Sequence, residues 1–110
     1  MPVKYNIEWT FSARNDLEEI VDFVSLDSTN NAIMLYEALV QKAESLINYP
    51  KRGRIIPELR RFGIDSYREI FHGPFRIFYK IKPDSTILIF GIIDGRRDLE
   101  QIVLNRITDL

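Results

Sequence analysis

Cysteine is absent from this sequence of 110 residues, and histidine and tryptophan occur once each. The lack of cysteine excludes disulfides and thiolate metal sites and suits a reducing compartment. A single imidazole, His72, argues against a conventional zinc or iron site, so we expect no metal and no cofactor. No apolar run approaches the roughly 18 residues of a membrane span, and the chain does not start with a signal-peptide core. The sequence therefore predicts a soluble, cytoplasmic protein with no membrane partner.

Glycine and proline are scarce, at five residues each, and a content of 45% hydrophobic and 28% charged residues is ordinary for a globular protein. We expect a single domain over residues 1–110. The net charge of −1 conceals an asymmetry, because residues 1–50 hold three basic and eight acidic residues, whereas residues 51–82 hold nine and three. A basic block beside an acidic one can guide an anionic partner, although solvated loops and strand faces give the same pattern.

Apolar residues recur at helical spacing in two stretches of the first half. The first stripe predicts a helix capped by Thr10 or Ser12 and ending near Leu26, and the second predicts a helix from about Asn31 to Asn48. A short turn between them favours an antiparallel hairpin. Alternation over Lys4–Trp9 predicts a strand before the hairpin.

The stretch from residue 67 to residue 97 predicts three strands joined by two tight turns. The strands are Tyr67–His72, Phe75–Ile81 and Ile87–Ile93, and the turns are Gly73-Pro74 and Lys82–Ser85. We interpret Lys51–Ser66 as a linker without a period, and Asp98–Leu110 as a short C-terminal helix. The sequence thus predicts an α+β fold of order β-α-α-β-β-β, in which an antiparallel helical hairpin packs on a twisted antiparallel sheet.

The predicted pairing of the last two strands leaves one apolar face that needs a cover. If Ile81 lies opposite Ile87, strict alternation places Phe78 opposite Phe90 and puts Ile93 on the hairpin side. The other face is too apolar to stand bare, so the terminal helix, a second copy or a partner must cover it. We call it the mixed face, and its predicted members are Arg76, Phe78, Lys80, Leu88, Phe90 and Ile92.

The first turn is ambiguous. A two-residue turn at Gly73-Pro74 places Glu69 on the face of Arg76, whereas a three-residue turn places Arg68 there, because a shift of one residue exchanges the faces of a strand. Electrostatics favours the three-residue turn, but the sequence alone does not decide between them.

Four short patterns follow one another along the chain. They are A-x-x-D-L (Ala13, Asp16, Leu17), P-x-x-G-R (Pro50, Gly53, Arg54), R-I-x-Y (Arg76, Ile77, Tyr79) and R-R-D (Arg96, Arg97, Asp98). In order and spacing, nearly the whole chain resembles the RelE/ParE superfamily of bacterial type II toxin–antitoxin systems, especially its ParE branch. The resemblance implies a toxin of a plasmid stabilisation or addiction system that a cognate antitoxin neutralises, with a homodimer or a heterotetramer left open.

The resemblance implies one of two mechanisms. ParE-like toxins inhibit DNA gyrase by direct binding, whereas RelE-like toxins are ribosome-dependent mRNA endonucleases, which need groups that position a phosphate and transfer protons. Arg68, Arg76 and Arg96 match basic positions of the nuclease pattern, and His72 is the one imidazole. The last predicted strand is followed by Asp94, where many ParE-like members have histidine, and residues 98–110 contain neither histidine nor tyrosine. We therefore favour gyrase inhibition without catalysis and assign no catalytic residue.

Seven residues are expected to contact the target or the antitoxin: Arg68, Arg76, Phe78, Lys80, Phe90, Arg96 and Arg97. Each has a structural alternative. Arg76 can form an internal ion pair with Glu58, Glu69 or Asp94, while Phe78 and Phe90 can belong to the core. The last two arginines can lie in a solvated turn.

Overall fold

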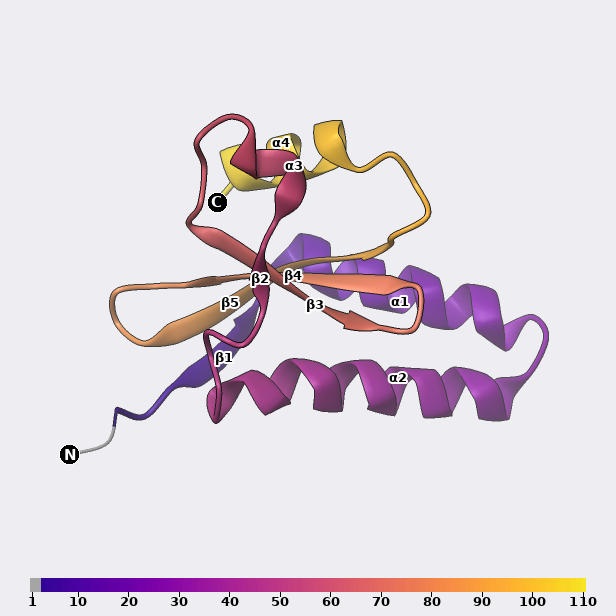
Figure 1. Ribbon diagram of the computed structural model, residues 1–110. Helices are drawn as coiled ribbons and strands as arrows, with labels where there is room; N and C mark the ends of the chain where they lie inside the picture. The colour runs from indigo at the N-terminus through magenta and orange to yellow at the C-terminus, as the bar shows by residue number, and fades with distance from the viewer. Residues whose placement is uncertain (1–2) are drawn as a thin grey trace.

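Two long helices, a five-stranded sheet and two short helices form three layers (Figure 1). The computed structural model describes residues 3–110. The elements are β1 (Asn6–Trp9), α1 (Phe11–Ser25), α2 (Thr29–Glu44), the 3₁₀ turn η1 (Ser45–Ile47), β2 (Arg54–Ile55), α3 (Pro57–Arg60), β3 (Tyr67–His72), β4 (Phe75–Ile81), β5 (Thr86–Asp94) and α4 (Glu100–Thr108). The α1–α2 hairpin covers one face of the sheet, and α3 and α4 lie together on the other.

The helical hairpin confirms the prediction from apolar spacing. Of the two candidate caps, Thr10 is the one used, since its Oγ1 accepts a hydrogen bond from the Ala13 N–H at 3.0 Å. Ser28 caps α2 in the same way, accepting from the Asn31 N–H at 3.1 Å, so α2 begins two residues earlier than predicted. No helix within residues 3–110 is both long and apolar enough to cross a membrane.

The strand order is β1-β5-β4-β3-β2, so the first strand of the chain lies beside the last. β1 runs parallel to β5, and the sheet is therefore mixed, whereas the prediction was an antiparallel sheet. The stretch interpreted as a linker contains β2 and α3. Both elements are shorter than the window over which a hydrophobic period can be recognised.

The hairpin between β3 and β4 has a two-residue turn, so the three-residue interpretation is wrong. His72 lies opposite Phe75, and Gly73 has a φ of +55°. A positive φ in the first central position of a two-residue turn matches the twist of the flanking strands and suits glycine. The turn puts Glu69 on the face of Arg76, where the two side chains form an ion pair.

A β-bulge at Phe90 corrects the predicted pairing of β4 with β5. The register is as expected from Ile81 opposite Ile87 to Tyr79 opposite Ile89, but Phe78 then lies opposite Gly91. The extra residue exchanges the faces of the last part of β5. Ile92 therefore packs under the helical hairpin and Ile93 packs under α4, the reverse of the prediction.

Two apolar cores lie on the two faces of the sheet. The core under the hairpin includes Leu39, Tyr79 and Ile89, all fully buried. The second core includes Phe78 and Phe90 of the mixed face, which lie beneath Leu59 of α3 and Val103 of α4. Of the three expected covers, the chain's own terminal helix is present, and it shares the task with α3.

Candidate functional site

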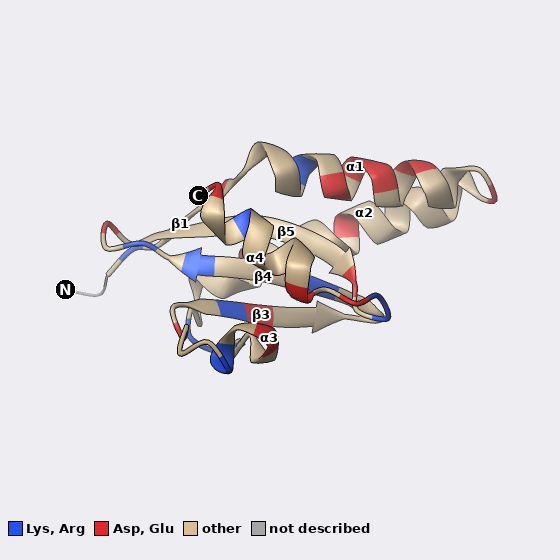
Figure 2. Ribbon diagram, turned by 90° about the horizontal axis from the view of Figure 1, so that it is seen from above, with Lys and Arg blue, Asp and Glu red and all other residues tan. Residues whose placement is uncertain are grey.

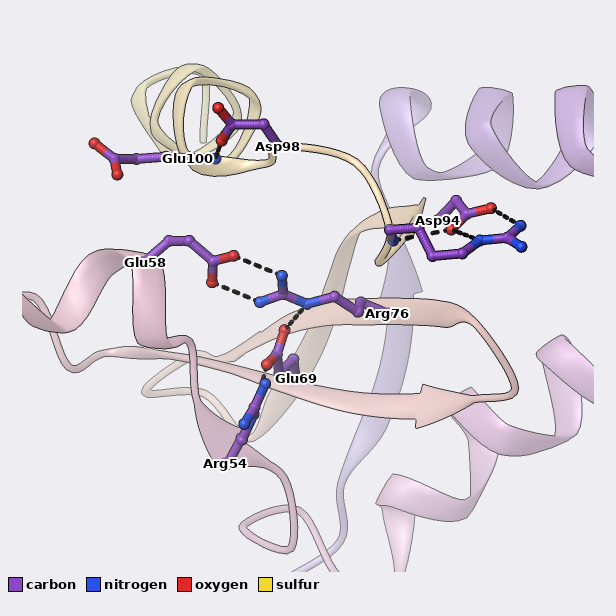
Figure 3. A network of polar contacts seen from close by, with 8 residues as sticks. Arg54, Glu58, Glu69, Arg76, Asp94, Asp98 and Glu100 are labelled. Atoms are coloured by element: carbon purple, nitrogen blue, oxygen red, sulfur yellow. Dashed lines mark hydrogen bonds and ion pairs between the residues drawn. The ribbon is translucent and has the colours of Figure 1, made fainter.

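Arg76 of β4 is held by carboxylates from two other elements (Figure 3). Its Nε donates to Glu69 Oε1 at 2.6 Å, and its Nη1 and Nη2 donate to the two oxygens of Glu58, each at 2.6 Å. Arg54 Nε donates to the other oxygen of Glu69 at 2.7 Å. We call Arg54, Glu69, Arg76 and Glu58 the arginine–glutamate network. It connects β2, β3, β4 and α3.

The network is charge-balanced, and its centre is withdrawn from water while Arg54 stays exposed. The Arg76 side chain is 8% exposed and that of Glu69 is fully buried. The hydrogen bond from Arg76 holds the pKa of Glu58 below its ordinary value of 4.5, and the same bond raises the pKa of Arg76. The ion-pair alternative for Arg76 is thus present, and a phosphate or a partner would have to displace two carboxylates to reach its guanidinium.

The P-x-x-G-R and R-I-x-Y patterns meet at the hydroxyl of Tyr79. This hydroxyl donates to the Pro50 carbonyl oxygen at 2.6 Å and accepts from the Gly53 N–H at 3.0 Å. Burial raises the pKa of Tyr79, which keeps the donor protonated. A Cβ at position 53 would lie 2.6 Å from the Glu69 carbonyl oxygen, so no side chain fits there. The two patterns therefore fix the chain where it enters β2.

Asp16, the aspartate of the A-x-x-D-L pattern, connects α1, the bulge in β5 and α4. Its two oxygens accept from Arg106 Nη2 at 2.7 Å and from Arg106 Nη1 at 2.8 Å. Asp16 Oδ2 also accepts from the Ile92 N–H at 3.0 Å, and Arg106 Nη1 donates to the Phe90 carbonyl oxygen at 2.9 Å. Asp16 and Arg106 thus bind main-chain groups of β5 beyond Ile89, where its pairing with β1 ends.

The three arginines of the nuclease pattern are not brought together on one face. Arg68 lies opposite Tyr79, on the face away from Arg76, and its Nη1 donates to the Gly53 carbonyl oxygen at 2.7 Å. Arg96 follows β5 and pairs with Asp94 at 2.5 Å. This pairing lowers the pKa of Asp94 to about 2.

The other predicted contact residues divide into buried and accessible ones. Phe78 and Phe90 stack inside the second core, with ring centroids 5.8 Å apart. Lys80 is partly exposed, with its Nζ 5.6 Å from the ring centroid of Tyr67, and Arg97 is exposed. His72 is half-buried at the end of the β3–β4 hairpin.

An apolar groove of about 450 Å³ lies between α1 and α2 next to the end of β1, and we call it the hairpin groove. It is lined by Trp9, Arg14, Leu17, Glu18, Val21, Asp22, Tyr36 and Val40. Figure 2 shows acidic residues gathered along α1, and two of them lie in the groove lining. Sequence reasoning missed this groove. The one sequence feature that indicated a groove was Val40, an apolar residue that lies off the main apolar stripe of α2.

A second hollow, of about 380 Å³, lies where β2 meets β3, and we call it the edge pocket. It is lined by Lys42, Arg52, Gly53, Arg54, Glu69, Ile70 and Phe71. The charge count located this basic block within residues 51–82, but the pocket could not be recognised without β2. Its lysine comes from α2, outside that block.

Comparison with solved structures identifies the fold. The chain has the fold of a chain in the chromosomal ParDE toxin–antitoxin system from P. aeruginosa, with a TM-score of 0.67, 22% identity, and 83% of this chain and 96% of that chain covered. The toxin–antitoxin complex RelBE2 from Mycobacterium tuberculosis gives a TM-score of 0.59 at 22% identity, covering 84% and 99% of the two chains. No curated protein sequence matches this chain.

A family model matches residues 7–99 and is described as the ParE toxin of the type II toxin–antitoxin system parDE. The chain therefore belongs to the ParE toxin family. This confirms the resemblance drawn from the four short patterns, and the fold confirms the predicted α+β order. The same patterns supply the network arginines, the Tyr79 contacts and Asp16, the partner of Arg106, and these contacts join separate elements of the fold.

Proposed function

We propose that this chain is the toxin of a bacterial plasmid-stabilising pair that acts in the cytoplasm by binding DNA gyrase without chemistry of its own. The observation that carries the proposal is the arginine–glutamate network. A ribonuclease needs free cationic groups around a scissile phosphate, whereas Arg76 is bound to two carboxylates and Arg68 lies on the opposite face. Membership of the ParE family favours the same conclusion.

The test compares two targets. Purified protein is added to gyrase supercoiling of relaxed plasmid and, separately, to translating ribosomes with a reporter mRNA. We expect supercoiling to stop while the mRNA stays intact. Cleavage of ribosome-bound mRNA with normal supercoiling would instead identify the RelE-like alternative, and harmless expression in cells would identify a relative that only binds its partner.

We propose that the cognate antitoxin lies in the hairpin groove. The groove lining includes the apolar side chains of Leu17, Val21 and Val40. Its two acidic residues outnumber the one basic residue, Arg14, which suits a partner helix with basic flanks. The neighbours in fold are described as toxin–antitoxin systems, which supports a protein partner of this kind.

A matched pair of substitutions on α2 tests this placement. Val40→Glu introduces a charge into the groove, and Ile33→Glu introduces the same charge at a position that is 51% exposed and outside it. We expect only Val40→Glu to weaken antitoxin binding, measured by calorimetry, while toxicity persists. Thermal melts of both variants check that each is folded. If both variants weaken antitoxin binding equally, the antitoxin binds outside this groove.

Arg96 and Arg97 are the accessible arginines that follow β5, and we propose that they contact the target. Replacing both by alanine should reduce inhibition of gyrase without changing the thermal midpoint. Their exposed side chains contribute little to stability. A variant that inhibits gyrase as well as the original protein would remove these residues from the contact surface.

A further inference from the structure

The sheet has an open stretch of edge beside β2. β2 has two residues and β3 has six, and the pairs are Arg54 opposite Glu69 and Ile55 opposite Arg68. The Ile56 N–H donates to the Tyr67 carbonyl oxygen at 3.1 Å, so alternate residues of β3 turn their main-chain groups toward β2. Phe71 is the next residue in that series. Its N–H and carbonyl therefore point to an edge where no strand formed by residues 3–110 lies.

The edge pocket surrounds this open stretch with cations on both sides of the sheet. Lys42 comes from α2, which packs on one face, and Arg54 shares the other face with Glu69. Arg52 lies on the segment entering β2, where its guanidinium donates to Ser45 Oγ. Within residues 3–110, no carboxylate lies at ion-pair distance from Lys42 or Arg52.

The one acid in the pocket lining does not cancel these charges. Glu69 is fully buried and already shared between Arg54 and Arg76. Arg54 keeps its Nη atoms outside that contact, and its guanidinium carbon lies 4.9 Å from the ring centroid of Phe71. The pocket is therefore positive at an edge that offers one main-chain donor and one acceptor.

We propose that an acidic peptide segment binds here in extended conformation as an added strand on β3. Its main chain pairs with Phe71, and its alternating side chains point to opposite faces, toward Lys42 on one and Arg54 on the other. A peptide suits the site better than a nucleic acid because the open edge offers a donor and an acceptor to a main chain. A nucleic acid also needs positive charge along a longer surface than this pocket, and the protein has a net charge of −1.

The probe is the capped peptide acetyl-Glu-Glu-Val-Glu-Glu-amide, whose extended form places glutamates on both faces. It is titrated into isotope-labelled full-length protein and followed by amide chemical shifts. We expect shifts at Phe71 and its neighbours, with a downfield change of the Phe71 amide proton as it gains an acceptor. The same peptide with every main-chain nitrogen methylated keeps its charge and should lose binding. Binding of the methylated peptide, or equal binding of a lysine-for-glutamate peptide or of single-stranded DNA, would overturn the proposal.

Charge reversal locates the site. The double variant Lys42→Glu, Arg52→Glu should weaken peptide binding by about tenfold or more. The double variant Arg60→Glu, Arg61→Glu is the matched control, since it reverses two exposed cations outside the pocket lining. Equal affinity in all three proteins would overturn the proposal. Because the readout is peptide binding, its result does not depend on whether the protein inhibits gyrase.

Discussion

Replacing Arg76 by methionine would separate a structural role from a contact role for this residue. The substitution keeps an unbranched side chain in the sheet and removes three hydrogen bonds to Glu58 and Glu69. Glu69 is fully buried and would retain only Arg54, whereas the Glu58 side chain is 24% exposed and can regain water. Removing one partner of a buried pair costs about 3–5 kcal/mol, so we expect a loss of about 3 kcal/mol.

Urea unfolding followed by circular dichroism measures this loss. A small domain has a total stability of about 5–15 kcal/mol and an m-value of about 1–3 kcal/mol per M, so the midpoint should fall by about 1–3 M. Adding Glu69→Gln to Arg76→Met should recover at least about 1 kcal/mol, because the amide removes a buried charge that the exposed Arg54 alone would have to balance. Arg97→Met is the surface control and should stay within about 0.5 kcal/mol of the original protein.

The opposite result would refute the structural reasoning. If Arg76→Met unfolds at the original urea concentration but no longer inhibits its target, then the guanidinium is a contact group and the network contributes little to stability. Toxicity in cells must be compared at equal amounts of folded protein, since a destabilised toxin is also degraded faster.

Three further substitutions or conditions test the other contacts. Tyr79→Phe should cost about 1–3 kcal/mol in urea unfolding, because the buried Gly53 N–H loses its acceptor; an unchanged midpoint would show that water replaces the hydroxyl. Asp16→Asn removes the charge that binds Arg106, so hydrogen exchange should accelerate in α4 and at the bulge but not in α2. The same change of rate in all three places would show that the Asp16–Arg106 pair does not hold α4 in place. The pKa of Glu58 is lowered from its ordinary value of 4.5, so the ionised Glu58 stabilises the fold when the pH is above 4.5. The free energy of unfolding should therefore fall as the pH drops below about 4.5, less steeply in Glu58→Gln than in the original protein.

Local patterns predicted the elements whose spacing repeats over many residues. The stripes of α1 and α2 gave the helical hairpin, and alternation in β4 gave its two faces. β2 and α3 have two and four residues, too few for a period to be recognised. The four short patterns gave the family because their order along the chain is itself a sequence property.

The candidate site depended on contacts that no local pattern contains. Asp16 accepts from Ile92 across 76 positions, and this contact accompanies the bulge that exchanges Ile92 and Ile93 between the faces. The two-residue turn brought Glu69 to Arg76, although counting charges had favoured the other register.

By itself, the sequence determined the helical hairpin, the three consecutive strands and the family, because each depends on residues close together or in fixed order. Only the tertiary structure decided which arginines are bound and which are free. Ion pairs join carboxylates and guanidinium groups from separate elements, so the accessibility of a charge depends on how those elements pack. The same packing covered the mixed face with α3 and α4 and left the edge of β3 open at Phe71, beyond its pairing with β2.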